Sequence, residues 1–61
     1  MTEEPRFFHL RQYALILAAN DDFKGAVDVS RRSLRLSIQA DNQDYVKMNN
    51  ESIAEWSKKI R

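Results

Sequence analysis

The chain has 61 residues, with ten Lys and Arg against nine Asp and Glu, so its net charge is +1 at pH 7. This near-balance argues against a general polyanion binder, which carries a strong basic excess. Cysteine is absent and His9 is the only histidine, which argues against disulfides and zinc-bound mini-folds. With 43% hydrophobic and 31% charged residues, the chain is expected to fold as one domain covering residues 1–61.

Neither the first residues of the chain nor its longest apolar run suggests a membrane partner. Residues 1–5 are acidic and lack the basic-then-apolar order of a signal peptide. The longest apolar run, Ala14 to Ala19, is far shorter than the ~20 residues that span a bilayer. We therefore expect a cytoplasmic protein. A chain of this size buries only about 60% of its unfolded surface, so its stability is expected to need good helix packing, self-association or a larger partner.

The first predicted helix covers about residues 4–19, with Thr2 as its cap. At about 100° per residue, one face carries mainly apolar side chains. Its members are Phe7, Leu10, Tyr13, Ala14, Leu17 and Ala18. The remaining sides carry Phe8, Leu15, Ile16 and Ala19. Apolar residues therefore nearly encircle this helix, and one partner helix cannot cover them all.

A cluster of Asn and Asp at residues 20–22 predicts a turn, because these side chains favour local hydrogen bonds to the backbone. The second predicted helix covers residues 22–40, with Asp21 or Asp22 as its N-cap. One apolar stripe contains Phe23, Val27, Leu34 and Ile38, flanked by Ala26, Ser30 and Ser37. A second stripe contains Val29, Ser33 and Leu36. Two apolar stripes and one polar face predict a middle helix that packs on two neighbours.

A second polar cluster at residues 41–44 predicts another turn, and the third helix is expected over residues 42–59. It starts near Asp41 or Asn42, with Asp41 as its cap and Asp44 as an acid in its first turn. Its broad inner face carries Tyr45, Val46, Met48, Ser52, Ile53, Trp56 and Ile60. Asn49 lies in the middle of this face. It is expected at the rim, bonded to a backbone carbonyl, or paired with Asn49 of a second copy. One unbroken helix through the second cluster, as in swapped dimers, is the alternative.

Residues 7–38 resemble one tetratricopeptide (TPR) repeat, in which a large-x2-large-small-x2-large helix is followed by an alanine-marked helix. The family's tryptophan, leucine, glycine and tyrosine positions carry Leu10, Tyr13, Ala14 and Leu17. Ala26 matches a family alanine, whereas Ser30 and Ser33 stand where an aromatic residue and an alanine are expected. The resemblance implies an all-α fold, a TPR-like hairpin plus a capping helix. It also implies a scaffold that binds proteins or assembles with itself.

Catalytic chemistry is not expected from these residues. His9 has no obvious carboxylate beside it, and N-capping explains the Asp pair of the first turn. Glu51 and Glu55, with lysines nearby, are typical of a solvated, ion-paired helix face. The sequence contains neither a glycine-rich phosphate loop nor a nucleophile motif. We therefore predict a non-enzymatic protein without a cofactor or a metal.

The second helix carries a basic cluster of Arg31, Arg32 and Arg35 on its polar face. Such a cluster is usually a solvated face, but it can also contact phosphates or an acidic partner peptide. No short turn precedes a plainly polar recognition helix here, which argues against a nucleic-acid partner. The preferred function is a protein-interaction or assembly module, and the alternative is a small nucleic-acid-binding regulator.

Self-association is expected because three helices cover only one stripe of each outer helix. Burying one large apolar side chain contributes ~1.5–3 kcal/mol, a sizeable share of what so small a chain holds alone. A two-fold dimer is the simplest closed assembly. The predicted contact residues of this homodimer, or of a higher closed oligomer, are Phe8, Leu15, Ile16 and Trp56. Trp56 also fits the core, because it shares a stripe with Ile53 and Ile60.

Overall fold

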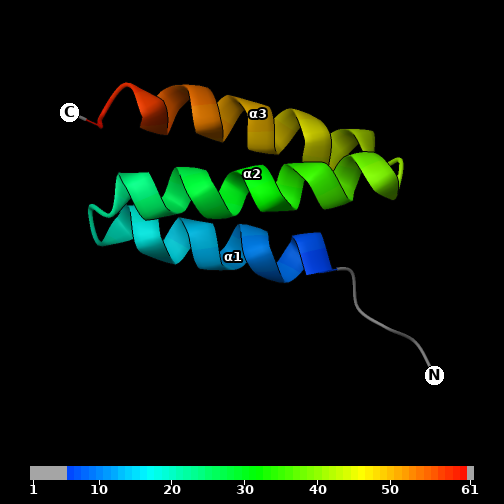
Figure 1. Cartoon of the computed structure of the whole chain (residues 1–61), viewed down its shortest axis with the longest axis horizontal. Helices are drawn as coiled ribbons and strands as arrows, with labels where there is room; N and C mark the ends of the chain where they lie inside the picture. Colours follow the sequence, from blue (N-terminus) through cyan, green and yellow to red (C-terminus); the bar gives the residue numbers. More distant parts are fainter. Residues whose placement is uncertain (1–5, 61) are drawn as a thin grey trace.

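The computed structural model describes residues 6–60, which form three α-helices and no strand. The helices are α1 (Arg6–Ala19), α2 (Phe23–Gln39) and α3 (Gln43–Ser57). Neighbouring helices run in opposite directions, with α2 in the middle (Figure 1). This confirms the all-α prediction. The second polar cluster, at residues 41–44, separates α2 from α3, so the alternative of one unbroken helix through this cluster is wrong. The predicted cap at Thr2 lies outside the described residues.

Each turn between helices contains one residue in the left-handed backbone region. Asp21 has a φ of 64° and Asp41 a φ of 57°. In the first turn, the N–H of Asp22 donates to the Leu17 carbonyl at 2.9 Å and the N–H of Asp21 to the Ala18 carbonyl at 3.0 Å. The second turn has the same pair of bonds. This is the Schellman arrangement, which ends a helix by satisfying its last carbonyl groups.

The residue that follows each left-handed aspartate caps the next helix. The Oδ1 atom of Asp22 accepts the Gly25 N–H at 3.1 Å, and that of Asn42 accepts the Tyr45 N–H at 3.2 Å. Of the two caps predicted for α2, Asp22 is therefore the cap, whereas the predicted cap of α3, Asp41, is wrong because Asn42 caps that helix. Asp21 and Asp41 end the preceding helices instead, with their backbones in the left-handed region.

Replacing Asp21 by glycine is expected to raise the free energy of unfolding by about 0.5 kcal/mol. Glycine adopts positive φ without the steric cost that a Cβ atom imposes, and this gain exceeds its entropic cost in the unfolded chain. Urea unfolding measures the change. Asp28→Gly, inside α2, is the matched control and should lower stability by about 0.5–1 kcal/mol. Equal losses in both variants would contradict the left-handed assignment.

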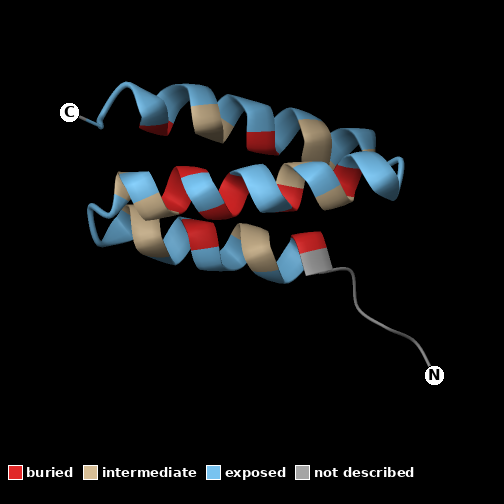
Figure 2. Cartoon of the chain, in the orientation of Figure 1, coloured by how far each residue is buried: buried red, intermediate tan, exposed pale blue. Residues whose placement is uncertain are grey.

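The core lies where α1 and α3 each pack against α2, while the backbones of α1 and α3 approach one another at few points. Its buried hydrophobic residues are Phe7, Ala14, Ala26, Val27, Val29 and Trp56. Ser30, Ser33 and Ser37 of α2 are also fully buried. In Figure 2, burial is concentrated on α2, and the outer sides of the other two helices are exposed. This is the arrangement that the two stripes of the middle helix predicted.

Four residues assigned to inner faces lie outside the core. Met48 and Ile60, assigned to the inner face of the third helix, are each 37% exposed, because α3 packs mainly on α2 alone. Tyr13 is 53% exposed and Ile38 is 59% exposed. Tyr13 precedes the fully buried Ala14, so the two side chains point about 100° apart around α1. Since α1 has only one close neighbour, the buried arc is too narrow to include both. Ile38 lies beyond Leu34 on the outer edge of its stripe, so it too falls outside the buried arc of its helix.

Candidate interaction surfaces

A chain of hydrogen bonds joins all three helices through the buried serines of α2. The Nδ2 atom of Asn49 donates to Ser33 Oγ at 2.9 Å, and Ser33 Oγ donates to the Phe7 carbonyl at 2.7 Å. Ser37 Oγ donates to the Ser33 carbonyl at 2.7 Å. Asn49 is 0% exposed, so it does not lie at the rim. Its amide group donates to a side chain of its own chain, not to a backbone carbonyl or a second Asn49.

Arg11 extends this polar network from α1 to α3. Its Nη1 atom donates to Ser52 Oγ at 2.6 Å and makes a longer contact of 3.5 Å with Asn49 Oδ1. The guanidinium carbon lies 6.0 Å from the centre of the Trp56 ring. Arg11 therefore joins α1 to α3, in addition to the ring contacts of Phe7 and Phe8 with Tyr45. The sequence interpretation missed Arg11, although it lies only about 40° from Phe7 on the helical wheel, beside the inner face.

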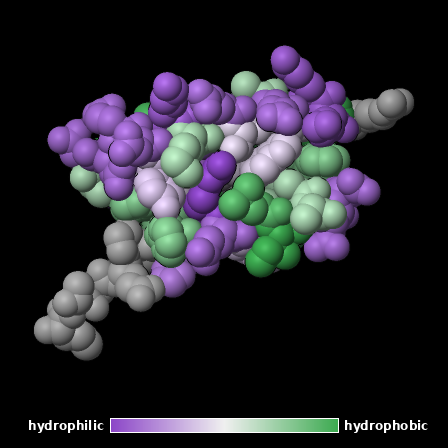
Figure 3. All heavy atoms as spheres, turned by 180° about the vertical axis from the view of Figure 1, so that it is seen from behind, coloured by the Kyte–Doolittle hydropathy of each residue, from purple (hydrophilic) through white to green (hydrophobic). Residues whose placement is uncertain are grey.

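The outward side of α1 carries no Asp, Glu, Lys or Arg among residues 7–19. Its exposed positions are Phe8, His9, Gln12, Tyr13, Leu15, Ile16 and Ala19. The outward sides of α2 and α3 instead carry many charged residues, including Lys24, Asp28, Arg31, Lys47 and Glu51. In Figure 3, hydrophobic side chains gather over the C-terminal half of α1, and hydrophilic ones cover much of the remaining visible surface. We call the exposed positions of residues 7–19 the α1 outer face.

The structure places the predicted contact residues in two different environments. Phe8, Leu15 and Ile16 all lie on the α1 outer face, where they are 41%, 45% and 58% exposed. One edge of the Phe8 ring approaches α3, with its centre 6.0 Å from that of Tyr45. Trp56 is only 9% exposed and packs in the core cluster. Its indole therefore has little surface left for a second copy.

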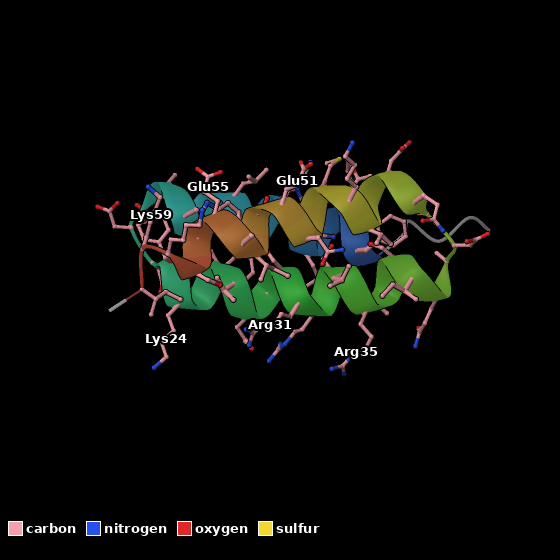
Figure 4. The ribbon with its side chains drawn as sticks, turned by 90° about the horizontal axis from the view of Figure 1, so that it is seen from above. Lys24, Arg31, Arg35, Glu51, Glu55 and Lys59 are labelled. Carbon is pink, nitrogen blue, oxygen red and sulfur yellow. The ribbon has the colours of Figure 1, made fainter. Side chains whose placement is uncertain are left out.

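The basic side chains of α2 project away from the other two helices. Viewed from above, α2 lies on one side, and Lys24, Arg31 and Arg35 point outward from it (Figure 4). Arg32 forms an ion pair with Asp28 at 3.4 Å, between side chains that are 68% and 65% exposed. An exposed pair of this kind contributes little to stability. The predicted basic cluster is thus a solvated row of cations on the ridge formed by α2.

The hollows of the described surface are shallow and chemically mixed. One of about 570 Å³ lies between the start of α2 and the end of α3, where Asp22, Lys24, Asp28 and Arg31 mix both signs of charge. Within residues 6–60, no group of three His, Asp or Glu residues could hold a metal ion. In the same range, no helix has both the length and the apolar character needed to cross a bilayer.

Comparison with known protein families, with curated proteins and with solved structures finds no significant match to this chain. The structure itself defines the class: a small three-helix protein whose middle helix packs on both neighbours. Its two distinctive surfaces are the charge-free α1 outer face and the row of cations on α2.

Proposed function

We propose that this chain is a non-enzymatic protein-interaction and assembly module, built on a TPR-like helical hairpin, which associates with itself through the α1 outer face. The order of elements supports the repeat-like part of the proposal. An antiparallel pair, α1 and α2, is followed by a third helix that packs on α2. Ala26, at the position of a family alanine, is 0% exposed in the packed part of α2. Small side chains there allow close approach of neighbouring helices.

The observation that carries the proposal is the absence of charge from the α1 outer face. Phe8, Leu15 and Ile16 keep about half of their surface in contact with water, which is costly for such large apolar groups. The buried hydrophobic core of the described residues is small, since two of its six members are alanines, two are valines, and Phe7 and Trp56 supply its two large rings. A second molecule covering α1 would therefore add a large fraction to the apolar surface already buried. With a net charge of +1, two copies repel each other only weakly.

Sedimentation equilibrium tests the assembly proposal directly. We expect a mass of twice the 7.2 kDa chain at micromolar concentration, because association covers the α1 outer face. Circular dichroism on the same samples reports whether the helices are formed. A folded monomer throughout this concentration range would overturn the assembly proposal.

A nucleic-acid-binding regulator is the second candidate, favoured only by the row of Lys24, Arg31 and Arg35 on α2. We expect no binding to duplex DNA at low ionic strength, because three cationic side chains can neutralise only about three phosphates, which gives little affinity. Fluorescence anisotropy with a labelled duplex measures this. Binding that disappears in an Arg31→Glu/Arg35→Glu variant and weakens steeply with salt would favour the regulator instead.

A further inference from the structure

A second hollow of the described surface, of about 430 Å³, lies between α2 and α3. Its α2 wall carries four residues at the spacing i, i+3, i+4 and i+7, which places them on one stripe of the helix. These residues are Arg31, Leu34, Arg35 and Ile38, and the α3 wall consists of Asn50 and Ile53. We call this hollow the α2–α3 groove.

The deeper part of the groove is apolar. Leu34 and Ile53 are partly buried, and Ile53 also packs against the core. Ile38, at the end of the α2 wall, is 59% exposed. The groove thus keeps apolar surface in contact with water, and covering it with apolar side chains of a partner is favourable.

The charged residues of the groove all carry the same sign. Arg31 and Arg35 are exposed and project outward from α2, on the side opposite to Glu51 of α3 (Figure 4). Asp28, the nearest acid along α2, forms its ion pair with Arg32. Among the described residues, no carboxylate therefore pairs with either guanidinium group of the groove. Two cations without a counter-ion stand beside an apolar surface.

We propose that the α2–α3 groove binds an acidic amphipathic α-helix of a partner protein. The apolar stripe of such a helix covers the apolar residues of the groove, and its Asp or Glu residues lie opposite Arg31 and Arg35. This interaction goes beyond the proposed self-association, which uses the α1 outer face and none of the groove residues.

The shape of the groove favours a helix as its occupant. Two helices that lie side by side leave a furrow between them, and a ridge of side chains from a third helix packs into such a furrow. The hollow at the start of α2 also reaches Arg31, so it continues the groove along α2. From Val27 to Ile38 the combined length is about 16 Å, or about three helical turns. Within residues 6–60 there is no strand whose edge could pair with an extended peptide.

The apolar residues distinguish this partner from a nucleic acid or an anionic membrane. Phosphate groups need only cations, so a phosphate backbone leaves the apolar part of the groove uncovered. A membrane-binding helix instead inserts exposed apolar side chains into the bilayer. Leu34 and Ile53 are partly buried and recessed in the groove, where a ridge of side chains can reach them and a bilayer surface cannot.

A charge-reversed pair of peptides tests the proposal by fluorescence anisotropy. The first probe is a labelled helical peptide of about four turns, with Leu at i, i+3, i+4 and i+7 and Glu on both sides of this stripe. The second has Lys in place of every Glu. We expect the protein to bind the Glu peptide at least tenfold more tightly than the Lys peptide. Equal binding of the two peptides would overturn the proposal.

The variant Arg31→Glu/Arg35→Glu is expected to reverse this preference and to bind the Lys peptide more tightly. A gain of binding of this kind cannot come from a protein that fails to fold. Arg32→Glu/Lys58→Glu is the matched control, because it changes the net charge equally at two exposed residues outside the groove. It should keep the preference for the Glu peptide. A reversal in both variants would show that net charge, not the groove, selects the peptide, and would overturn the proposal.

Two isoleucines of equal exposure test the apolar part of the contact. Ile38→Ser is expected to weaken binding of the Glu peptide about tenfold, because it removes an apolar side chain that the peptide covers. Ile16→Ser, on the α1 outer face, is the matched control, since the two side chains are 59% and 58% exposed. It should leave the affinity unchanged. A loss confined to Ile16→Ser would place the peptide on α1 and overturn the proposal.

Two further measurements separate the remaining occupants. Cosedimentation with phosphatidylserine vesicles, without a preference for the Glu peptide, would assign the cations of α2 to a membrane and overturn the proposal. Sedimentation equilibrium of Arg31→Glu/Arg35→Glu should give the same mass as the wild type, because the groove takes no part in self-association. A lower mass would show that the groove binds a second copy instead. Failure of peptide binding is thus distinguished from failure of self-association.

Discussion

Leu15→Glu is expected to convert the dimer into monomers and to raise its dissociation constant more than about 100-fold. The leucine is 45% exposed in one copy, and the two-fold contact would bury it twice, once in each subunit. Losing two burials of this partly exposed side chain costs about 1.4–2.7 kcal/mol, and desolvation of the two carboxylates raises the total above the ~2.7 kcal/mol that a 100-fold change requires. Sedimentation equilibrium measures the dissociation constant.

Arg32→Glu is the matched control for this substitution. It also introduces a carboxylate and makes the net charge more negative, but its side chain is 68% exposed on the opposite ridge. We expect it to change neither the mass nor the helical content. Leu15→Glu should also reduce helicity at micromolar concentration, because the isolated monomer has a small core. An unchanged mass for Leu15→Glu would contradict the contact surface.

Local chemistry explains why the helices could be predicted from the sequence. Turns are signalled by Asn and Asp side chains, and these act on residues only three positions away, as the bond from the Gly25 N–H to Asp22 shows. Helical periodicity then identified α2 as the middle helix, because two apolar stripes need two neighbours. The choice between Asp21 and Asp22 as the cap depends on a backbone dihedral, and composition does not report it.

The polar network could not be predicted because its partners are remote in sequence. Arg11 bonds to residues 38 and 41 positions further along the chain. From the sequence, Ser30 and Ser33 are only small spacers on α2, although their hydroxyl groups have different environments. Trp56 presented a similar ambiguity, since a large aromatic residue suits a core and an interface equally well. Only the placement of α3 against α2 separates these alternatives.

Ser33→Ala is expected to lower the free energy of unfolding by about 2–3 kcal/mol. The hydroxyl group of Ser33 accepts from Asn49 and donates to the Phe7 carbonyl, and all of these groups are buried. Removing it leaves two polar groups without that partner, each at a cost of about 1–3 kcal/mol, partly offset by the higher helix propensity of alanine. Urea unfolding at a fixed protein concentration measures the change.

Ser30→Ala is a closely matched control, because it removes the same atom from a fully buried serine one turn earlier on α2. The Ser30 Oγ atom is buried without a hydrogen-bond partner among the described residues. Its removal should therefore raise stability by up to about 1 kcal/mol, through relief of desolvation and the better propensity of alanine. Similar losses in both variants would indicate that packing, not hydrogen bonding, determines the cost at Ser33.

A double variant distinguishes the network from the cavity that Ser33→Ala leaves. Asn49→Leu in the Ser33→Ala background removes the buried amide that lost its partner and keeps a side chain with the same branched arrangement of heavy atoms. Because replacing both partners of a buried hydrogen bond by apolar groups is nearly neutral, we expect about half of the lost stability to return, while the cost at the Phe7 carbonyl remains. Asn49→Leu alone should be destabilising, since Ser33 Oγ and Arg11 Nη1 then lose their contacts with the amide. Additive losses in the double variant would show that the two residues stabilise the fold independently.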